Sequence, residues 1–190
     1  IALLGAGPVS LAVARDLLPL GYECTAYERD PIPGGLMRTN IPSFRLPAEV
    51  LDEECNQIIN MGLEVEYNYE VKSFKDFLKL GHDAIFIGTG APKGKDLKIP
   101  GREEASKNIH IGIDFLASVA FEHVSKIGKK VIVLGGGNTA MDCCRTAVRL
   151  GGKEVGVYVR SPKADMKASD WEVEEAEMEN IPIYENHVPK

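Results

Sequence analysis

The sequence predicts an α/β fold made of two Rossmann-type dinucleotide-binding units with parallel sheets. Apolar strand-like runs alternate with helix-like runs, a pattern typical of parallel strands joined by right-handed crossovers. A strand, a glycine-rich loop and a helix follow one another twice, with the loops at residues 5–10 and 135–140. Between them, residues 92–104 are rich in Lys, Gly, Pro and Glu, as expected of a connector. We therefore expect a first domain over residues 1–108 and a second over residues 109–190.

The first unit is expected to open with a strand over residues 1–4, a helix over 8–20 and a strand over 23–27. Pro8 suits the first turn of that helix, where its missing N–H is not needed, and Gly21 suits the C-terminal end. The remaining elements follow from apolar periodicity and from the residues at element ends: a helix over residues 47–61 ended by Gly62, a strand over 63–67, a helix over 74–80 capped by Ser73, and a buried strand over 84–87.

The second unit is expected to repeat this plan. Its elements are a helix over residues 113–124, a strand over 131–134, a helix over 138–150, a strand over 155–159, a helix from 169 to 180, and a strand over 181–190. The helix that begins at Ser169 carries a capping box, since Glu172 stands three residues later. The chain begins inside a strand and ends in one that leads onward, so we expect it to be incomplete at both ends.

Composition and charge exclude several classes of protein. A formal net charge of −6 argues against nucleic acid as a main partner, because phosphate binding requires a basic face. No apolar run is long enough to span a bilayer, and no leader resembles a signal peptide. Free cysteines without a C-x-x-C pair indicate neither a metal site nor a dithiol, and they fit a cytoplasmic protein. The histidines show no metal-ligand spacing and are expected on the surface or in loops: His82, His110, His123 and His187.

The first glycine loop has the chemistry of a diphosphate site. Gly5 permits the tight turn, Gly7 lets the backbone approach a diphosphate, and Ser10 occupies the third small position, where helix packs on strand. The N-terminus of the following helix, which Pro8 begins, attracts negative charge.

An acidic residue and a second pair of glycines follow this loop. Glu28 ends the next strand about 20 residues beyond the glycines, where a carboxylate accepts hydrogen bonds from a ribose diol. The alternative is that Glu28 forms a surface ion pair with Arg29 or a lysine. Gly34 and Gly35 either let backbone amides reach a second stretch of diphosphate or form only a turn.

The second glycine loop repeats the fingerprint with a different strand end. Gly135, Gly137 and Ala140 match the glycine positions, while Asn138 and Thr139 supply the start of the helix.

The following strand ends in Val159 and Arg160 rather than in an acidic residue. A cation there favours the 2′-phosphate of NADP over the ribose diol of NAD, and Lys163 adds to the charge. The alternative is a solvated Arg160 on a surface turn, so NAD and NADP both stay open. Asp142 and Arg145, in the same helix, either orient the nicotinamide side or form a structural ion pair.

Several motifs occur in a characteristic order. They are Gly5-x-Gly7-Pro8-x-x-Leu11-Ala12, Glu28-Arg29, Gly34-Gly35-Leu36-Met37-Arg38, Ile41-Pro42-x-Phe44-Arg45-Leu46, Gly88-Thr89-Gly90-Ala91, Ile99-Pro100-Gly101-Arg102-Glu103 and Gly135-Gly136-Gly137-Asn138-Thr139-Ala140-Met141-Asp142-Cys143. In this order they resemble the small (β) subunit of glutamate synthase and its relatives, which include the FAD/NADPH region of dihydropyrimidine dehydrogenase and flavin subunits of multi-subunit oxidoreductases. The resemblance covers nearly the whole chain. The resemblance does not extend to two further segments of the family, an N-terminal cysteine-rich iron–sulfur segment and a C-terminal segment that closes over the FAD.

The resemblance implies that the first unit holds FAD and the second a nicotinamide dinucleotide. By this resemblance Glu28 would bind the adenosine ribose of FAD, and Val71 would meet the adenine through its backbone. The other FAD contacts implied are with the diphosphate, the ribityl path, the flavin and the crossing to the second domain: Gly5, Gly7, Pro8, Ser10, Arg29, Gly34, Gly35, Leu36, Arg38, Arg45, Thr89 and Gly90.

The absence of redox-active cysteine pairs distinguishes this chain from thioredoxin reductase-like and glutathione reductase-like flavoenzymes. No C-x-x-C precedes the second glycine loop, and no cysteine pair follows Gly34 and Gly35. The resemblance therefore implies an electron-input module in which hydride passes from NAD(P)H to FAD, with no catalytic side chain of the protein's own. Electrons would leave to iron–sulfur clusters in missing segments or a partner, or to a larger catalytic subunit. The alternatives are a free-standing NAD(P)H:acceptor reductase and a redox-inactive nucleotide-binding structural or regulatory subunit.

Overall fold

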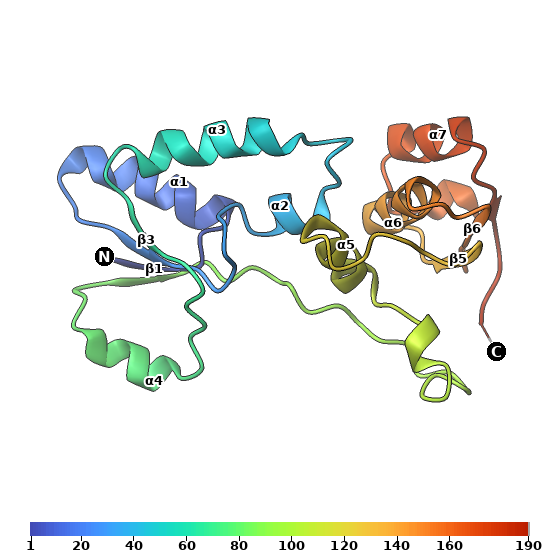
Figure 1. The fold of residues 1–190 in the computed structure, drawn as a ribbon, viewed down its shortest axis with the longest axis horizontal. Coiled ribbons are helices and arrows are strands. Elements are labelled where there is room, and N and C mark those ends of the chain that lie inside the picture. Colours follow the sequence, from blue (N-terminus) through green and yellow to red (C-terminus); the bar gives the residue numbers. More distant parts are fainter. Residues whose placement is uncertain (190) are drawn as a thin grey trace. The chain divides into compact units, whose positions relative to one another are not determined.

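The computed structural model describes residues 1–189, which form two compact units, one over Ile1–Pro92 and one that begins at Lys93 (Figure 1). Each unit contains a parallel sheet covered by helices, so the predicted α/β fold with two parallel sheets is confirmed. The division of the two units lies at Pro92, whereas the sequence suggested a boundary at residue 108. Residues 93–108 thus belong to the second compact unit.

The first sheet has four parallel strands in the order β3-β2-β1-β4. They are β1 (Ala2–Leu4), β2 (Thr25–Tyr27), β3 (Glu64–Glu66) and β4 (Ile85–Ile87). Leu4, at the end of β1, is in register with Tyr27 on one side and Ile87 on the other. The carboxyl ends of these strands therefore meet at one edge of the sheet, where an α/β fold places its ligands.

Helices cover both faces of this sheet. They are α1 (Pro8–Leu17), a 3₁₀ turn (Leu18–Leu20), α2 (Leu36–Asn40), α3 (Ala48–Ile59), α4 (Phe74–Phe77) and a second 3₁₀ turn (Leu78–Leu80). Figure 1 shows α1 and α3 on one face and α4 on the other. Leu3 of β1 packs with Leu11 and Leu51 of these two helices, whereas Leu4 packs with Phe77 of α4. Alternate residues of one strand thus serve two separate cores.

The predicted ends of the first helices are correct in kind. Gly21 ends the 3₁₀ turn after α1 with a left-handed φ of 88°. The hydroxyl of Ser73 accepts a hydrogen bond from the Asp76 amide (3.2 Å), as predicted for the cap of α4. The helix α2 was not expected, because its Leu36–Asn40 run is short and follows a glycine pair. The strand predicted at residues 84–87 is present as β4, but its predicted burial was wrong, because β4 lies at the edge of the sheet and Ile87 is 59% exposed.

The second sheet has three parallel strands in the order β5-β6-β7. The elements of this unit are a 3₁₀ turn (Ser106–Asn108), α5 (Gly112–Ala120), β5 (Lys130–Leu134), α6 (Asn138–Arg149), β6 (Glu154–Tyr158), a 3₁₀ turn (Lys163–Asp165), α7 (Asp170–Met178) and β7 (Ile183–Tyr184). The core joins Met141 of α6, Val157 of β6, Val173 of α7 and Ile181.

Two predictions about this unit were wrong in detail. Ser169 stands at the N-cap of α7, but no side-chain capping bond forms, and its Oγ is buried without a hydrogen-bond partner among residues 1–189. The expected strand over residues 181–190 is reduced to Ile183–Tyr184, and Lys190 lies outside the described residues. Both departures lie where the chain turns, and tertiary contacts decide the local backbone there.

All four cysteines are free and buried. Over residues 1–189 no helix is both long enough and apolar enough to cross a bilayer.

Candidate dinucleotide-binding sites

The two glycine loops have the same backbone geometry. The Gly5 amide donates to the Tyr27 carbonyl (2.8 Å), and the Gly135 amide donates to the Tyr158 carbonyl (3.1 Å). Gly5 and Gly135 have φ angles of 97° and 140°, which side-chain-bearing residues rarely adopt. Each loop ends in the N-cap of a helix, Gly7 for α1 and residue 137 for α6. The sequence repeat is therefore a structural repeat, and each unit aims a helix N-terminus past its loop.

Three glycine-bearing segments meet in the first unit. A Cβ on Gly5 would lie 2.9 Å from the Gly88 carbonyl oxygen, and a Cβ on Gly35 would lie 2.9 Å from the Gly7 Cα. The Gly34 amide also donates to the Ala6 carbonyl (3.0 Å). Gly34 and Gly35 therefore pack directly on the first loop instead of forming only a turn. The result is a cradle of bare backbone at the carboxyl end of the sheet, of the kind that diphosphates occupy.

A buried hydroxyl lies under this cradle. Ser10 is fully buried, and its Oγ has no hydrogen-bond partner among residues 1–189. It faces Gly88, where an added Cβ would lie only 2.1 Å from the Ser10 Oγ. Pro8, by contrast, is exposed at the start of α1. Thr89 and Gly90 follow Gly88 and are both exposed.

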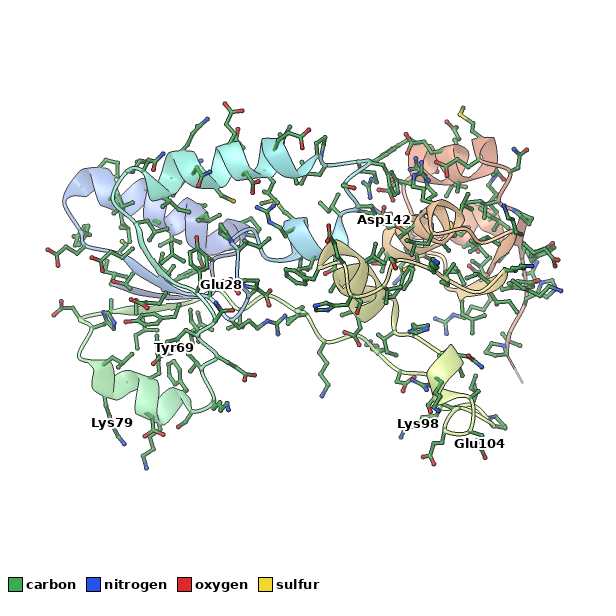
Figure 2. All side chains as sticks on the ribbon, viewed as in Figure 1. Glu28, Tyr69, Lys79, Lys98, Glu104 and Asp142 are labelled. Atoms are coloured by element: carbon green, nitrogen blue, oxygen red, sulfur yellow. The ribbon has the colours of Figure 1, made fainter. Side chains whose placement is uncertain are left out.

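Glu28 lies at the carboxyl end of β2 and is only 5% exposed (Figure 2). Its Oε2 accepts a hydrogen bond from the Ala6 amide (2.7 Å), and its Oε1 accepts one from the Asp30 amide (2.9 Å). Arg29 is exposed and lies 3.6 Å from Asp30. Glu28 is therefore a buried carboxylate fixed to the glycine loop, and the alternative of a surface ion pair with Arg29 was wrong.

Other predicted residues of the first unit have different surroundings. The Arg38 guanidinium donates to the Pro33 carbonyl (2.9 Å) and to the Asp52 carboxylate (2.5 Å), and so ties α2 to α3. Leu36 is exposed directly after Gly35, and Arg45 is half-buried. Val71 packs against the cluster under α4. Gly35 and Leu36 thus adjoin the cradle, whereas the charge of Arg38 is balanced within the protein.

The second glycine loop lies beside a hollow within its own unit. Gly135, Gly137, Thr139 and Ala140 line a cavity of about 780 Å³, together with the exposed Ile132 and Leu134 of β5. This volume is within the usual range for a ligand site. A Cβ on Gly137 would meet nothing within 4 Å, so its backbone is open to a ligand.

The other side of this loop is covered by the chain that leads to α7. The Gly136 carbonyl accepts from the amides of Lys167 (2.9 Å) and Ala168 (3.0 Å). The Asn138 side-chain oxygen accepts from the Ser169 amide (3.0 Å). Asn138 therefore orders the loop from within, and the exposed Thr139 remains on the cavity side.

The strand ends show how the two units differ. Leu4 is in register with Tyr27, and Leu134 is in register with Tyr158, so Val159 occupies the position that matches Glu28. Val159 is 2% exposed, and a Cβ on Gly136 would lie 3.1 Å from its Cγ1. The apolar side chain of Val159 thus lies against the second glycine loop, at the position where the carboxylate of Glu28 accepts a hydrogen bond from the first loop.

The two cationic residues predicted after β6, Arg160 and Lys163, differ in their surroundings. Arg160 is exposed. The Lys163 ammonium donates to Glu177 of α7 (2.6 Å), and the Lys163 amide donates to Glu185 (2.7 Å). Lys163 is therefore already paired, whereas Arg160 extends from the end of the strand. Its neighbour His187, whose amide donates to the Val159 carbonyl (2.8 Å), was treated in the sequence as an ordinary loop histidine.

Asp142 and Arg145 are both buried in α6 (Figure 2 labels Asp142). Arg145 forms ion pairs with Glu175 of α7 and with Glu179, the residue that follows α7, the latter at 2.8 Å. Arg149 also pairs with Glu179, at 2.6 Å. Arg145 thus takes part in structural ion pairs, which link α6 to the C-terminal end of α7.

The buried thiols of α6 are poor nucleophiles. Burial raises the pKa of the Cys143 thiol to about 12, and burial likewise raises the pKa of Cys144 to about 12. The thiolate is the reactive form of cysteine, so neither residue has redox or nucleophilic character at neutral pH. Over residues 1–189, no three His, Cys, Asp or Glu side chains are grouped as metal ligands.

Sequence reasoning missed the role of Gly88 in the first cradle. Gly88 was read only as part of a glycine-rich motif, although its contact with Gly5 closes the cradle. The sequence placed Val159 and Arg160 together at the second strand end, and the register identifies Val159 as the counterpart of Glu28. Nothing in the sequence indicated that His187 lies beside Val159, because that position depends on the β6–β7 pairing.

Comparisons with known proteins agree with this geometry. A family model described as pyridine nucleotide-disulphide oxidoreductase matches residues 1–190. The chain is 35% identical over 195 residues to the glutamate synthase (NADPH) small chain of Azospirillum brasilense, covering 95% of this chain and 40% of that one. It is 35% identical over 193 residues to the NAD-dependent dihydropyrimidine dehydrogenase subunit PreT homolog of Salmonella typhi, covering 100% and 46%.

Among solved structures, Mycobacterium tuberculosis FprA in complex with NADPH matches with a TM-score of 0.77 at 20% identity, covering 93% of this chain and 46% of that one. At this identity the likeness concerns the fold. The chain spans less than half the length of each of these proteins.

Proposed function

The chain belongs to the pyridine nucleotide-disulphide oxidoreductase family, and we propose that it forms the dinucleotide-binding core of an FAD-dependent NAD(P)H oxidoreductase. The predicted resemblance to the small subunit of glutamate synthase is confirmed by the relatives. One observation supports the proposal most strongly: the glycine loop at Gly5 and the Gly34–Gly35 pair form a single cradle of bare backbone.

We propose an FAD-binding domain over residues 1–108, which takes in the first compact unit and the segment 93–108 that follows it. The first compact unit suits FAD. Gly5, Gly7 and Gly35 have no side chains that would fill the cradle, and the N-terminus of α1 favours the diphosphate. The unpartnered Ser10 hydroxyl provides a polar atom beneath it. Glu28 has two oxygens already oriented by amides, which leaves further lone pairs for a ribose diol. The remaining proposed contacts are Pro8, Arg29, Gly34, Leu36, Arg38, Arg45, Val71, Thr89 and Gly90.

We propose an NAD(P)-binding domain over residues 109–190, which belongs to the second compact unit. This unit suits a nicotinamide dinucleotide. Gly135, Gly137 and Ala140 keep its loop small, and the cavity beside that loop has the volume of a ligand site. Thr139 and Asn138 begin α6, whose N-terminus favours a diphosphate. Arg160 lies at the strand end where the adenosine ribose binds in such folds, with Lys163 nearby in the chain.

The chemistry belongs to the cofactor. When bound, FAD accepts a hydride from NAD(P)H and passes the electrons onward. The protein's residues bind and orient, since the buried Cys143 and Cys144 cannot form thiolates near neutral pH. We propose that the electrons pass to iron–sulfur clusters or to a larger catalytic subunit, and that the protein works in the cytoplasm. The relatives are named as a small chain and as a subunit, which supports a role within a larger assembly.

Flavin content tests this proposal. In the full-length protein that contains this chain, Gly35→Ala should lower the flavin-to-protein ratio at least tenfold, because its Cβ would lie 2.9 Å from the Gly7 Cα. Gly62→Ala is the matched control: Gly62 also has a positive φ (112°), but its Cβ would meet nothing within 4 Å. This control should keep its flavin. Equal flavin content in both variants, or a wild-type protein without flavin, would contradict the FAD assignment.

A further inference from the structure

The second unit lacks the carboxylate that fixes the first loop. In the first unit the Glu28 Oε2 accepts from the Ala6 amide (2.7 Å). In the second, the matching Val159 is buried and packs toward Gly136. A carboxylate at this position is what recognises the 2′-hydroxyl of NAD, so the second loop has no acceptor of that kind at this position.

An irregular pairing brings His187 beside the end of β6. The Val159 amide donates to the Tyr184 carbonyl (2.9 Å), and the His187 amide donates back to the Val159 carbonyl (2.8 Å). Glu185 and Asn186 both stand between these two bonds, one residue more than a regular parallel ladder has. Asn186 accommodates the extra residue with a φ of 57°. His187 consequently lies next to the Val159–Arg160 peptide.

The imidazole of His187 is held at one nitrogen. Its Nδ1 lies 2.5 Å from the Glu185 carbonyl oxygen. A carbonyl can only accept, so Nδ1 carries the hydrogen and Nε2 remains for a ligand. The rings of Tyr158 and Tyr184 stack with a centroid separation of 4.6 Å, and the His187 ring meets their edges at 5.7 and 6.0 Å.

Some of the charged side chains around His187 already have partners within the protein, whereas others are exposed. The Glu185 carboxylate accepts from the Lys163 amide, and the Lys163 ammonium is paired with Glu177. Arg160 and His187 are both exposed, and each can carry positive charge. A dianionic phosphate matches an arginine fork and an imidazolium, both of which donate hydrogen bonds.

We propose that Arg160 and His187 together bind the 2′-phosphate of NADP(H), so that the second unit selects the phosphorylated dinucleotide. This inference rests on the proposed function of that unit. Arg160 lies just after the end of β6, and His187 lies in the loop after β7.

Calorimetric titration of the full-length flavin-loaded protein with 2′,5′-ADP and with 5′-ADP tests the inference. The wild type should bind 2′,5′-ADP at least tenfold more tightly. His187→Gln should reduce that preference about fivefold with little effect on 5′-ADP, and Arg160→Gln should reduce it further. His187→Arg should retain it. His123→Gln, the same change at an exposed histidine elsewhere in the unit, is the matched control and should behave as wild type.

The outcomes separate this inference from the function beneath it. Equal affinity for the two ligands in the wild type, or an unchanged preference in His187→Gln, overturns the inference while leaving a dinucleotide site. Failure to bind either ligand overturns both the inference and the nicotinamide-dinucleotide role of the second unit.

Discussion

The Ser10 hydroxyl occupies the space into which a side chain at Gly88 would project: a Cβ on Gly88 would lie 2.1 Å from the Ser10 Oγ. Ser10 stands in α1 and Gly88 follows β4, so the pair joins the helix after the first glycine loop to β4, the edge strand next to β1. A larger third residue in the fingerprint is thus tolerated because the facing residue has no side chain.

This pair predicts a strong coupling. Gly88→Ala should destabilise the protein by about 1–3 kcal/mol, the usual effect of overpacking a closed site. Ser10→Ala alone should be nearly neutral, because it removes a buried hydroxyl without a partner. The double variant Ser10→Ala/Gly88→Ala should recover most of the loss, measured as urea unfolding midpoints. Simple addition of the two single effects would show that the two residues do not share this space.

The ion pairs between α6 and α7 should contribute measurably to stability. The Arg145 side chain is 9% exposed and contacts both Glu175 and Glu179, so Arg145→Ala removes this partner from Glu175 and leaves Glu179 paired with Arg149. We expect a loss of about 1–3 kcal/mol, below the range for fully buried pairs because both glutamates keep contact with water. Lys130→Ala, which breaks the exposed pair with Glu154, should leave the thermal midpoint unchanged. The prediction fails if the two variants lose equal stability.

Acid should weaken the same helix pair. The hydrogen bond from Arg149, followed by that from Arg145, lowers the pKa of Glu179 below its ordinary value. A carboxyl whose folded pKa is depressed stabilises the protein above its unfolded pKa, about 4.3 for Glu, and loses this contribution as pH falls through the folded value. Glu179→Gln should therefore cost less stability at pH 3 than at pH 6. An identical cost at both pH values would show that ionised Glu179 contributes nothing.

The thiols of Cys143 and Cys144 should be inert in the native protein. With a pKa of about 12, each is almost wholly protonated at pH 8. Iodoacetamide at pH 8, followed by peptide mass spectrometry, should leave both unlabelled until urea unfolds the protein. Rapid native labelling of either residue would contradict the burial of this helix face.

Much of the fold follows from local sequence rules. The elements β1, α1, β5 and α6 could be predicted from the two glycine loops, each of which lies between an apolar run and a helical run. Strand, turn and helix preferences agree in these segments. The position of Glu28 at the carboxyl end of β2 also followed from spacing alone. These features depend on residues close together in sequence.

The departures depend on contacts between distant residues. Lys163 has the charge expected at a phosphate site, but Glu177 of α7 pairs with it. Ser169 begins α7, yet its hydroxyl does not cap the helix. Ile87 is apolar and was expected to be buried, but its strand forms the edge of the sheet. In each case the partner or the neighbour is set by the fold, and no local pattern identifies it.

We propose that this chain binds two dinucleotides, one in each unit, and that electrons pass from one to the other. An anaerobic absorbance titration of the full-length protein, first with NADH and then with NADPH, tests it most directly. We expect a bound flavin band that NAD(P)H bleaches at a one-to-one ratio of nucleotide to flavin. An absent flavin, or a flavin that neither nucleotide reduces, would contradict the claim and indicate a redox-inactive nucleotide-binding subunit.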